Sequence, residues 1–302
     1  MSSVIFVVGY GRSGSTLLDR LLGCAEGTVS TGELRNLWRR GFQKNQRCSC
    51  GSAFADCPFW CAVIAEAFPD GVPDPGAVLA VRRRANAVRR VRQIVRGAAL
   101  SAPEREYLDL WRRIYRAIGQ VSGADVIIDS SKDAGHAFFF AGAQGVDARY
   151  IHLIRDGRAA AFSRTRVKLR PEVQGGGARM RVRNPLRSAL RWGAVNAEID
   201  RLGRGSAPIT RLRYEDLLRD PLATLRTTVA ALGLDLDYPD TLLRDGEVSL
   251  APNHMVSGNP VRFQTGGVAL REDQEWRQAM PRRHRLGVEF IARAGLRRYG
   301  YL

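Results

Sequence analysis

A glycine-rich loop near the N-terminus combines the residue types that bind phosphate. The residues concerned are Gly9, Gly11, Arg12, Ser13, Gly14, Ser15 and Thr16. Before the loop, the apolar run at 4–8 is typical of a buried strand, and after it the leucine spacing over 17–22 is typical of a helix. Free backbone N–H groups in such a loop and the positive end of the helix dipole both favour an anion. The segment therefore predicts a phosphate-binding loop between the first strand and the first helix.

Three kinds of phosphate loop fit parts of this pattern. The dinucleotide-binding pattern needs an acidic residue about 20 positions further on, at the end of a second strand. Glu33 has that distance, but no long apolar strand precedes it. A nucleotide triphosphatase loop needs lysine where this chain has Ser15, and here the basic residue stands earlier, at Arg12. The segment 12–18, Arg-Ser-Gly-Ser-Thr-Leu-Leu, closely resembles the 5′-phosphosulfate loop of the sulfotransferases that use 3′-phosphoadenosine 5′-phosphosulfate (PAPS).

A second candidate anion site follows the strand predicted at 148–154. Arg155 stands at the end of that strand, and Ser163 follows in the next predicted helix. An arginine at a strand end and a serine about two helical turns later can meet at one anion. The pair resembles the 3′-phosphate motif of the same family, which implies that Arg155 and Ser163 bind the 3′-phosphate of PAPS.

Two further segments resemble nucleotide-contacting parts of the family. The segment 212–217, Leu-Arg-Tyr-Glu-Asp-Leu, resembles the one whose tyrosine lies near the adenine, which implies this role for Tyr214. The segment that begins at Ser257 resembles the C-terminal loop that closes over the nucleotide, which implies contacts from Ser257, Asn259 and Arg262. The chain lacks the arginine-lysine-glycine triplet that the cytosolic enzymes carry in that loop.

The resemblance also implies which residues carry catalysis. Sulfuryl transfer needs positioning, charge stabilisation and a base for the attacking hydroxyl. None of the four histidines has the context of the histidine base of cytosolic relatives, whereas Glu33 resembles the glutamate base of other branches. Arg12 and Lys132 resemble the residues that stabilise the transferred sulfuryl group and the bridging oxygen. A helix-terminal acid and a surface lysine are the alternative interpretations of Glu33 and Lys132.

The order of the predicted elements favours an α/β fold. Apolar segments of strand length alternate with helical ones, which indicates a central parallel sheet with helices on both faces. We expect a single sulfotransferase domain over 1–302 and a helix over 34–40. A cysteine-containing and helical insertion on the acceptor side is expected at about 41–121, with two helices over 75–121. The segment 169–187, rich in Arg, Gly and Pro, is a candidate lid.

Composition limits the class of protein and of partner. The 302 residues carry a net charge of +17, almost wholly from arginine, which suits an anionic partner. The resemblance implies PAPS as donor, 3′-phosphoadenosine 5′-phosphate (PAP) as product, and a hydroxyl of a small molecule, lipid or glycan as acceptor. A P-loop nucleotide-dependent kinase and a non-catalytic polyanion-binding protein remain the alternatives.

No segment interleaves basic and exposed aromatic residues as a nucleic-acid binder would, so we expect no nucleic-acid partner. Neither a signal peptide nor a run of about 20 apolar residues is evident, so we expect a cytoplasmic enzyme without a membrane span. The sequence leaves the oligomeric state open.

Four cysteines form a separate candidate site. They are Cys48, Cys50, Cys57 and Cys61. Thiolates are preferred zinc ligands, and structural disulfides are rare in a reducing compartment. The spacing matches no common zinc ribbon, so disulfides and buried free thiols remain alternatives to a zinc site.

Overall fold

Within the described residues, a five-stranded parallel sheet forms the centre of the molecule, in the strand order β2-β3-β1-β4-β5. The computed structural model describes residues 2–141, 146–167, 169, 171–173, 178–204, 208–239, 241–244, 246–271 and 274–302. The strands are β1 Ser3–Val8, β2 Thr28–Gly32, β3 Val126–Lys132, β4 Asp147–Ile154 and β5 Ile209–Arg213. The predicted α/β fold with a central parallel sheet is confirmed.

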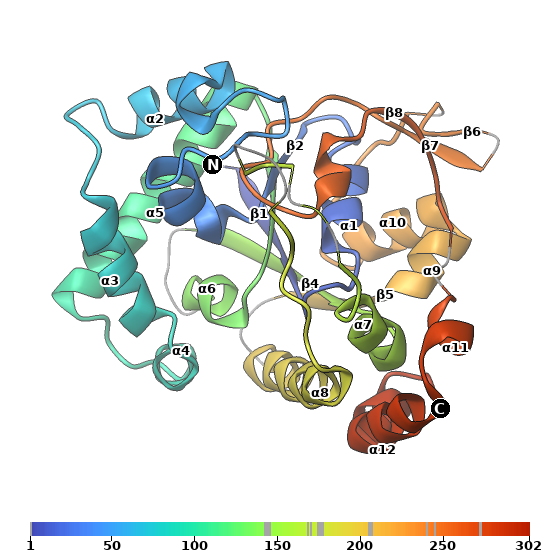
Figure 1. Cartoon of the computed structure of the whole chain (residues 1–302). Coiled ribbons are helices and arrows are strands. Elements are labelled where there is room, and N and C mark those ends of the chain that lie inside the picture. The colour runs from blue at the N-terminus through green and yellow to red at the C-terminus, as the bar shows by residue number, and fades with distance from the viewer. Residues whose placement is uncertain are drawn as a thin grey trace.

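Helices surround this sheet, and a smaller antiparallel sheet lies beside it (Figure 1). The α-helices are α1 Ser15–Leu22, α2 Pro58–Ala67, α3 Pro75–Ala85, α4 Val88–Val95, α5 Ala102–Ser122, α6 Ala134–Phe139, α7 Gly157–Ser163, α8 Pro185–Leu202, α9 Tyr214–Arg219, α10 Pro221–Ala230, α11 Trp276–Ala279 and α12 Arg282–Arg298. The small sheet consists of β6 Leu243–Arg244, β7 Glu247–Leu250 and β8 Gly266–Ala269. None of the described helices is both long and apolar enough to cross a membrane.

The side chains of β1 alternate between the two faces of the sheet, as the pleat of a strand requires. Val4, Phe6 and Val8 belong to the apolar cluster that includes residues of α5 and α6. Ile5 and Val7 belong to the cluster that includes α1 and α10. Both faces of β1 are therefore buried, which explains why its sequence is a continuous apolar run.

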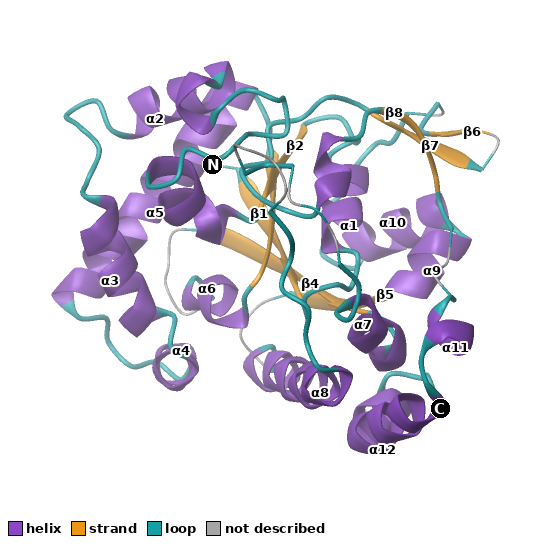
Figure 2. Ribbon diagram, in the orientation of Figure 1, coloured by secondary structure: helices purple, strands orange, loops and turns teal. Residues whose placement is uncertain are grey.

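The helical segments differ from the expectation at two places. Residues 34–40 form a 3-10 turn at Leu34–Asn36 and then a π-helix at Leu37–Phe42, instead of one α-helix. Residues 75–121 contribute to three helices instead of two, because Ala87 adopts an extended conformation (φ −64°, ψ 128°) and starts α4 as a new helix. Together with α2, these helices make up the group at the left of Figure 2.

Candidate active site

A cleft of about 1580 Å³ lies at the carboxyl ends of the central strands, the edge at which open α/β sheets bind ligands. Each strand contributes at its end: Gly11 after β1, Glu33 after β2, Lys132 in β3, Arg155 after β4 and Tyr214 after β5. The cationic side chains of the lining are Arg12, Arg35, Arg40, Lys132, Arg155, Arg164, Arg166, Arg179, Arg181, Arg183, Arg191 and Arg271, and its carboxylates are Glu33, Asp133, Glu172 and Glu198. The cleft is therefore strongly positive, which suits a polyanionic ligand.

The loop between β1 and α1 has a backbone shape that depends on glycine. Gly14, directly before α1, has a φ of 90°, and a Cβ there would lie 2.1 Å from the ring of Tyr214. Arg12 also has a positive φ, of 82°. Such a conformation costs a non-glycine residue roughly 1–3 kcal/mol, and strained residues of this kind gather at ligand sites. The loop therefore packs closely against Tyr214 at the carboxyl ends of the strands.

This loop presents hydrogen-bond donors that the rest of the described chain does not use. From Gly11 to Thr16, no backbone N–H donates to an acceptor among the described residues. The hydroxyl of Ser13 is buried and also has no partner there. Unsatisfied donors are costly, and these lie where the dipole of α1 favours a negative charge. The arrangement fits a phosphate group, as the sequence predicts.

Arg12 carries a positive charge that no carboxylate of the described chain balances. Its Nε donates to Ser163 Oγ at 3.1 Å, and one terminal nitrogen lies 3.3 Å from Met180 Sδ, a weak acceptor. Burial and, to a lesser extent, the neighbouring charges of Arg164, Arg155 and Arg166 together lower the pKa of Arg12 from 12.5 to about 10. An anion in the cleft would offset both the cost of burying the charge of Arg12 and its repulsion by the other arginines.

Arg155 and Tyr214 lie next to Arg12. One terminal nitrogen of Arg155 donates to the carbonyl oxygen of Arg12 at 3.1 Å, and the guanidinium lies 5.0 Å from the ring centre of Tyr214. Ser163 also lies beside these residues, because its hydroxyl accepts a hydrogen bond from Arg12 Nε. The structure therefore brings together four of the side chains that the resemblance assigns to the nucleotide, namely Arg12, Arg155, Ser163 and Tyr214.

Glu33 and Lys132 form an ion pair on the β2–β3 side of the cleft. Lys132 Nζ donates to Glu33 Oε1 at 2.6 Å, and Asn36 Nδ2 donates to Glu33 Oε2 at 2.7 Å. Burial alone raises the pKa of Glu33, but the charge and hydrogen bond of Lys132, with the charges of Arg40 and Arg35, outweigh burial and lower the pKa to about 2. Glu33 is therefore ionised at neutral pH and already paired.

Comparisons with known proteins identify the family of the chain. The sequence matches the profile of the sulfotransferase family over residues 4–239. The chain belongs to the sulfotransferase family. Among solved structures, it is similar to the sulfotransferase domain from the curacin biosynthetic pathway, with 17% identity and a TM-score of 0.55, over 100% of this chain and 99% of that one. It also matches sulfotransferase STF1 from Mycobacterium tuberculosis H37Rv, with 17% identity and a TM-score of 0.39, over 78% of this chain and 69% of that one.

The likeness to the curacin-pathway domain shows a shared fold. A search of curated proteins gives no match. Membership of the family makes the chain a sulfotransferase-family enzyme, so the nucleotide kinase and the non-catalytic polyanion binder no longer stand as alternatives.

Two residues that the resemblance assigns to the nucleotide of a sulfotransferase lie outside the cleft lining. Ser257 is fully buried, and its hydroxyl accepts from Arg40 at 2.8 Å and from Asn36 at 3.3 Å. Arg262 is 1% exposed and donates to the carbonyl oxygens of Met255 and Arg47. Because Ser257 Oγ and the two terminal nitrogens of Arg262 already bond within the chain, both residues support the C-terminal loop in this structure instead of facing the cleft.

Asn259, the third residue predicted in that loop, does line the cleft. Its backbone N–H donates to Thr16 Oγ1 at 3.0 Å, and its side chain accepts from Val261 N at 3.3 Å, which caps the 3-10 turn Pro260–Phe263. The C-terminal loop is thus fixed directly to the start of α1.

One described residue of the candidate lid, Met180, contacts Arg12. Arg183 N donates to the carbonyl oxygen of Arg164, and Leu169 pairs with Arg179 in an isolated bridge. The glycine triplet at 175–177, on which the lid prediction centres, lies outside the described residues.

The cysteine cluster differs from the predicted set by one member. Cys61 is exposed, and its thiol lies 3.1 Å from the carbonyl oxygen of Ala55, away from the other three. His254, which no sequence motif connects with the cysteines, takes its place beside Cys48, Cys50 and Cys57. The sequence spacing could not predict that this histidine lies beside the cysteines, because it stands 197 positions after Cys57.

Proposed function

We propose that the chain transfers a sulfuryl group from PAPS to a hydroxyl of a small-molecule, lipid or glycan acceptor. The observation that carries the proposal is the pairing, in one cleft, of a phosphate loop with unused donors and an ionised carboxylate beside a lysine. PAPS supplies the activated sulfuryl group, and PAP is the product that leaves. The chain would act as a single domain.

On the phosphate side, the loop from Gly11 to Thr16 would hold the 5′-phosphosulfate with its free N–H groups. Arg12 would balance the charge of that group, since it has no carboxylate partner among the described residues. Arg155 and Ser163 would hold the 3′-phosphate. Tyr214, against which the loop packs, would border the adenine together with Asn259.

On the other side, Glu33 would take the proton of the attacking hydroxyl. An ionised carboxylate has about four lone-pair sites, and the contacts of Lys132 and Asn36 occupy two of them. A carboxylate with a pKa of about 2 is a weak base. Lys132 would serve the bridging oxygen of the donor, and a weaker contact of its ammonium with Glu33 would raise the pKa of Glu33 and make it a stronger base.

The helical segment at 41–121 would border the acceptor. Val88, at the start of α4, lines the cleft, as do Arg35 and Arg40 just before the segment. Arg35 pairs with Asp133 and Arg40 lies 3.9 Å from Glu172, so the charges of this wall are largely balanced within the chain. An acceptor with an apolar part would suit the side chain of Val88.

The proposal is tested by incubating the protein with sulfur-labelled PAPS and a panel of phenols, aliphatic alcohols, glycans and hydroxylated lipids. We expect PAP formation that depends on one class of acceptor, with label on the product. ATP with magnesium serves as the control donor and is expected to give no transfer. Failure of both PAPS and PAP to bind would contradict the proposal, whichever acceptors are tried.

A further inference from the structure

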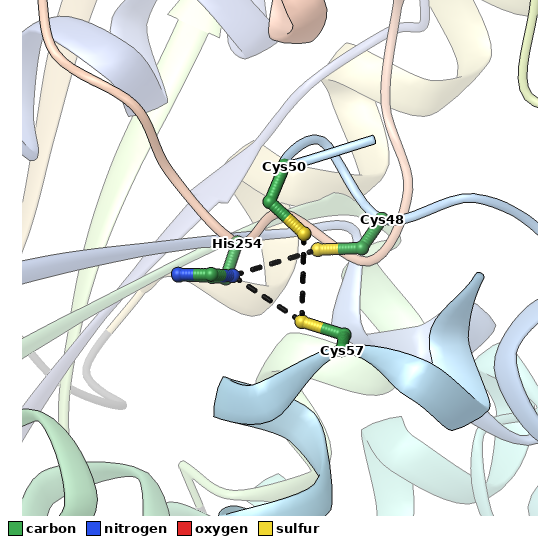
Figure 3. Close-up of side chains that lie close together, drawn as sticks. All are labelled: Cys48, Cys50, Cys57 and His254. Atoms are coloured by element: carbon green, nitrogen blue, oxygen red, sulfur yellow. Dashed lines mark hydrogen bonds between the residues drawn. The ribbon is translucent and has the colours of Figure 1, made fainter. Parts of the chain in front are cut away.

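Three cysteines and one histidine, outside the cleft, direct their ligand atoms at a common point (Figure 3). The sulfurs of Cys48, Cys50 and Cys57 and a ring nitrogen of His254 all lie within 4.8 Å of one another. The first two stand in the loop after the π-helix, Cys57 is the residue before α2, and His254 lies in the C-terminal loop. Segments far apart in sequence thus supply one set of four ligands.

Three of the six distances between the ligand atoms are close to those of a tetrahedral zinc site, and the other three are at most 4.8 Å. With Zn–S near 2.3 Å and Zn–N near 2.0–2.1 Å, a regular tetrahedron has edges of about 3.8 Å between sulfurs and about 3.5 Å between sulfur and nitrogen. The sulfurs of Cys50 and Cys57 are 3.7 Å apart, and His254 Nδ1 lies 3.3 Å from Cys57 Sγ and 3.9 Å from Cys48 Sγ. A disulfide needs about 2.0 Å, so no pair of these thiols is bonded.

The backbone around the ligands holds them in place. Cys48 N donates to Ser52 O and Gly51 N donates to Cys48 O, which closes a tight turn. Gly51 has a φ of 98°, a conformation that glycine adopts without strain. This turn places Cys48 and Cys50 on the same side, where both sulfurs reach Cys57.

The histidine is also oriented by its surroundings. Its ring stacks on Phe59, with centres 5.0 Å apart and planes inclined by 15°, and its carbonyl oxygen accepts from Trp60 Nε1 at 2.8 Å. Such contacts, which fix the direction of a ligand, are typical of metal sites. They come from α2, the helix that Cys57 precedes.

A buried cation lies close to the cluster. Arg262 donates to the carbonyl oxygens of Arg47 and Met255, the residues directly next to Cys48 and His254 in sequence. Three thiolates and a neutral histidine around Zn²⁺ leave one negative charge, which a guanidinium nearby would balance. Arg262 lies outside the cleft lining, and balancing the charge of a zinc site would account for its burial.

We propose that Cys48, Cys50, Cys57 and His254 bind a structural zinc ion. Four protein ligands leave no open position for a substrate or water, as in structural rather than catalytic zinc sites. The ion would clamp the loop 46–52 and α2 to the C-terminal loop, which continues directly to the active site. There, Glu33 N donates to Ser257 O at 2.9 Å and Asn259 N donates to Thr16 Oγ1 at 3.0 Å.

The test uses the full chain, purified under reducing conditions without a metal-affinity tag. Metal analysis should give about one zinc ion per chain, and replacement by cobalt should give the visible absorption of tetrahedral Co²⁺ with thiolate charge transfer. Thiol titration adds an independent count. Of the five cysteines, only Cys24 and Cys61 should react while zinc is bound, and a chelator should release three more.

A pair of matched variants locates the ion. Cys50→Ser changes an exposed ligand and should weaken zinc binding by more than about 100-fold, since even the neighbours of ligands contribute about 10- to 100-fold. Cys61→Ser makes the same change at an exposed cysteine outside the cluster, and should leave zinc affinity and thermal stability unchanged. Chelation should lower the melting temperature of the wild type and of Cys61→Ser.

Three results would overturn the inference. One is a reduced wild-type protein that holds no zinc and takes up neither zinc nor cobalt. Another is a disulfide within the cluster in protein purified with reductant. The third is an equal loss of zinc in Cys61→Ser and Cys50→Ser.

Discussion

The two sides of the active-site cleft differ in how their charges are balanced. On the phosphate side, the described chain offers Arg12 no carboxylate, and burial with three neighbouring arginines lowers its pKa to about 10. On the β2–β3 side, Glu33 is already paired with Lys132 and Asn36. The first side is electrostatically incomplete without an anion, whereas the second is complete before any ligand arrives. Substitutions on the first side should therefore change binding, and substitutions on the second should change turnover.

The largest effect is expected at Glu33. In Glu33→Gln the amide keeps the size of the side chain but cannot take a proton, so turnover should fall by about 10²- to 10⁴-fold, the usual range for a lost general base. PAP affinity should stay within a few-fold of the wild type. Steady-state rates and calorimetry with PAP measure the two quantities.

Glu26→Gln is the matched control, because it makes the same change at an exposed position seven residues earlier. It should leave both turnover and PAP binding unchanged. Near-normal turnover of a folded Glu33→Gln protein would remove Glu33 from the mechanism.

The two sides of the cleft also differ in how much of each could be predicted from the sequence. The phosphate loop could be predicted because its shape follows from local residues: glycines at 9, 11 and 14 between an apolar strand and a leucine-rich helix. The parallel sheet followed from the alternation of strands and helices. Both depend on neighbours along the chain, which spacing records.

Features that depend on distant contacts could not be predicted in this way. Arg262 donates to Arg47, 215 positions away, and Ser257 accepts from Arg40, 217 positions away, so a local motif gave no sign that their polar groups bond inside the fold. His254 joins the cysteines over a similar distance. The ion pair of Glu33 with Lys132 likewise depends on the adjacency of β2 and β3.

A smaller effect on turnover is expected at Lys132, with a distinct dependence on pH. Lys132→Met removes the largest of the interactions that lower the pKa of Glu33, so that pKa should rise from about 2. Because the base must be ionised, the acid limb of the pH–rate profile should move to higher pH. Loss of one charge-assisted hydrogen bond, of about 1.5–3 kcal/mol, corresponds to about 10- to 150-fold in turnover.

The pH–rate profiles of the wild type and Lys132→Met measure this shift. An acid limb at the same pH in both proteins would show that Lys132 does not set the pKa of Glu33. A loss of PAP binding without loss of turnover would move Lys132 to the binding side.

An effect on stability instead of turnover is expected at Asp19 of α1, which contacts Ser130 and Gly32 on the β2–β3 side. Its Oδ2 accepts from Ser130 Oγ at 2.5 Å and from Gly32 N at 3.1 Å. Complete burial raises its pKa and outweighs the hydrogen bonds of Ser130 and Ser30, which lower it, so that the pKa rises from 3.8 to about 7. Since the pKa is higher in the folded state, the stability that Asp19 contributes is full below pH 3.8 and is lost as the pH rises through 7.

Asp19→Asn carries no charge at any pH and should lack this loss. The difference in unfolding free energy between variant and wild type should therefore change between about pH 4 and 7, by at most about 1.4 kcal/mol per pH unit, and be constant above that range. Urea unfolding over a pH series measures it, with Asp70→Asn at an exposed position as the control. A difference that does not vary with pH would contradict the ionisation assigned to Asp19.

The central claim is that different residues of this cleft bind the 5′-phosphate and the 3′-phosphate of PAPS. Calorimetric titration with PAP and 5′-AMP tests it most directly. A charge-assisted hydrogen bond contributes about 1.5–3 kcal/mol, and each 1.4 kcal/mol is about tenfold, so two contacts to the 3′-phosphate predict a preference for PAP of about a hundredfold or more. Arg155→Ala should remove most of this preference for PAP and hardly change the affinity for AMP. Ser163→Ala should reduce the preference in the same way but by less. Arg12→Ala should lower the affinity for both PAP and AMP, because both carry the 5′-phosphate. Equal weakening of PAP and AMP by Arg155→Ala, or binding of magnesium ATP as tight as that of PAP by the wild type, would contradict the account.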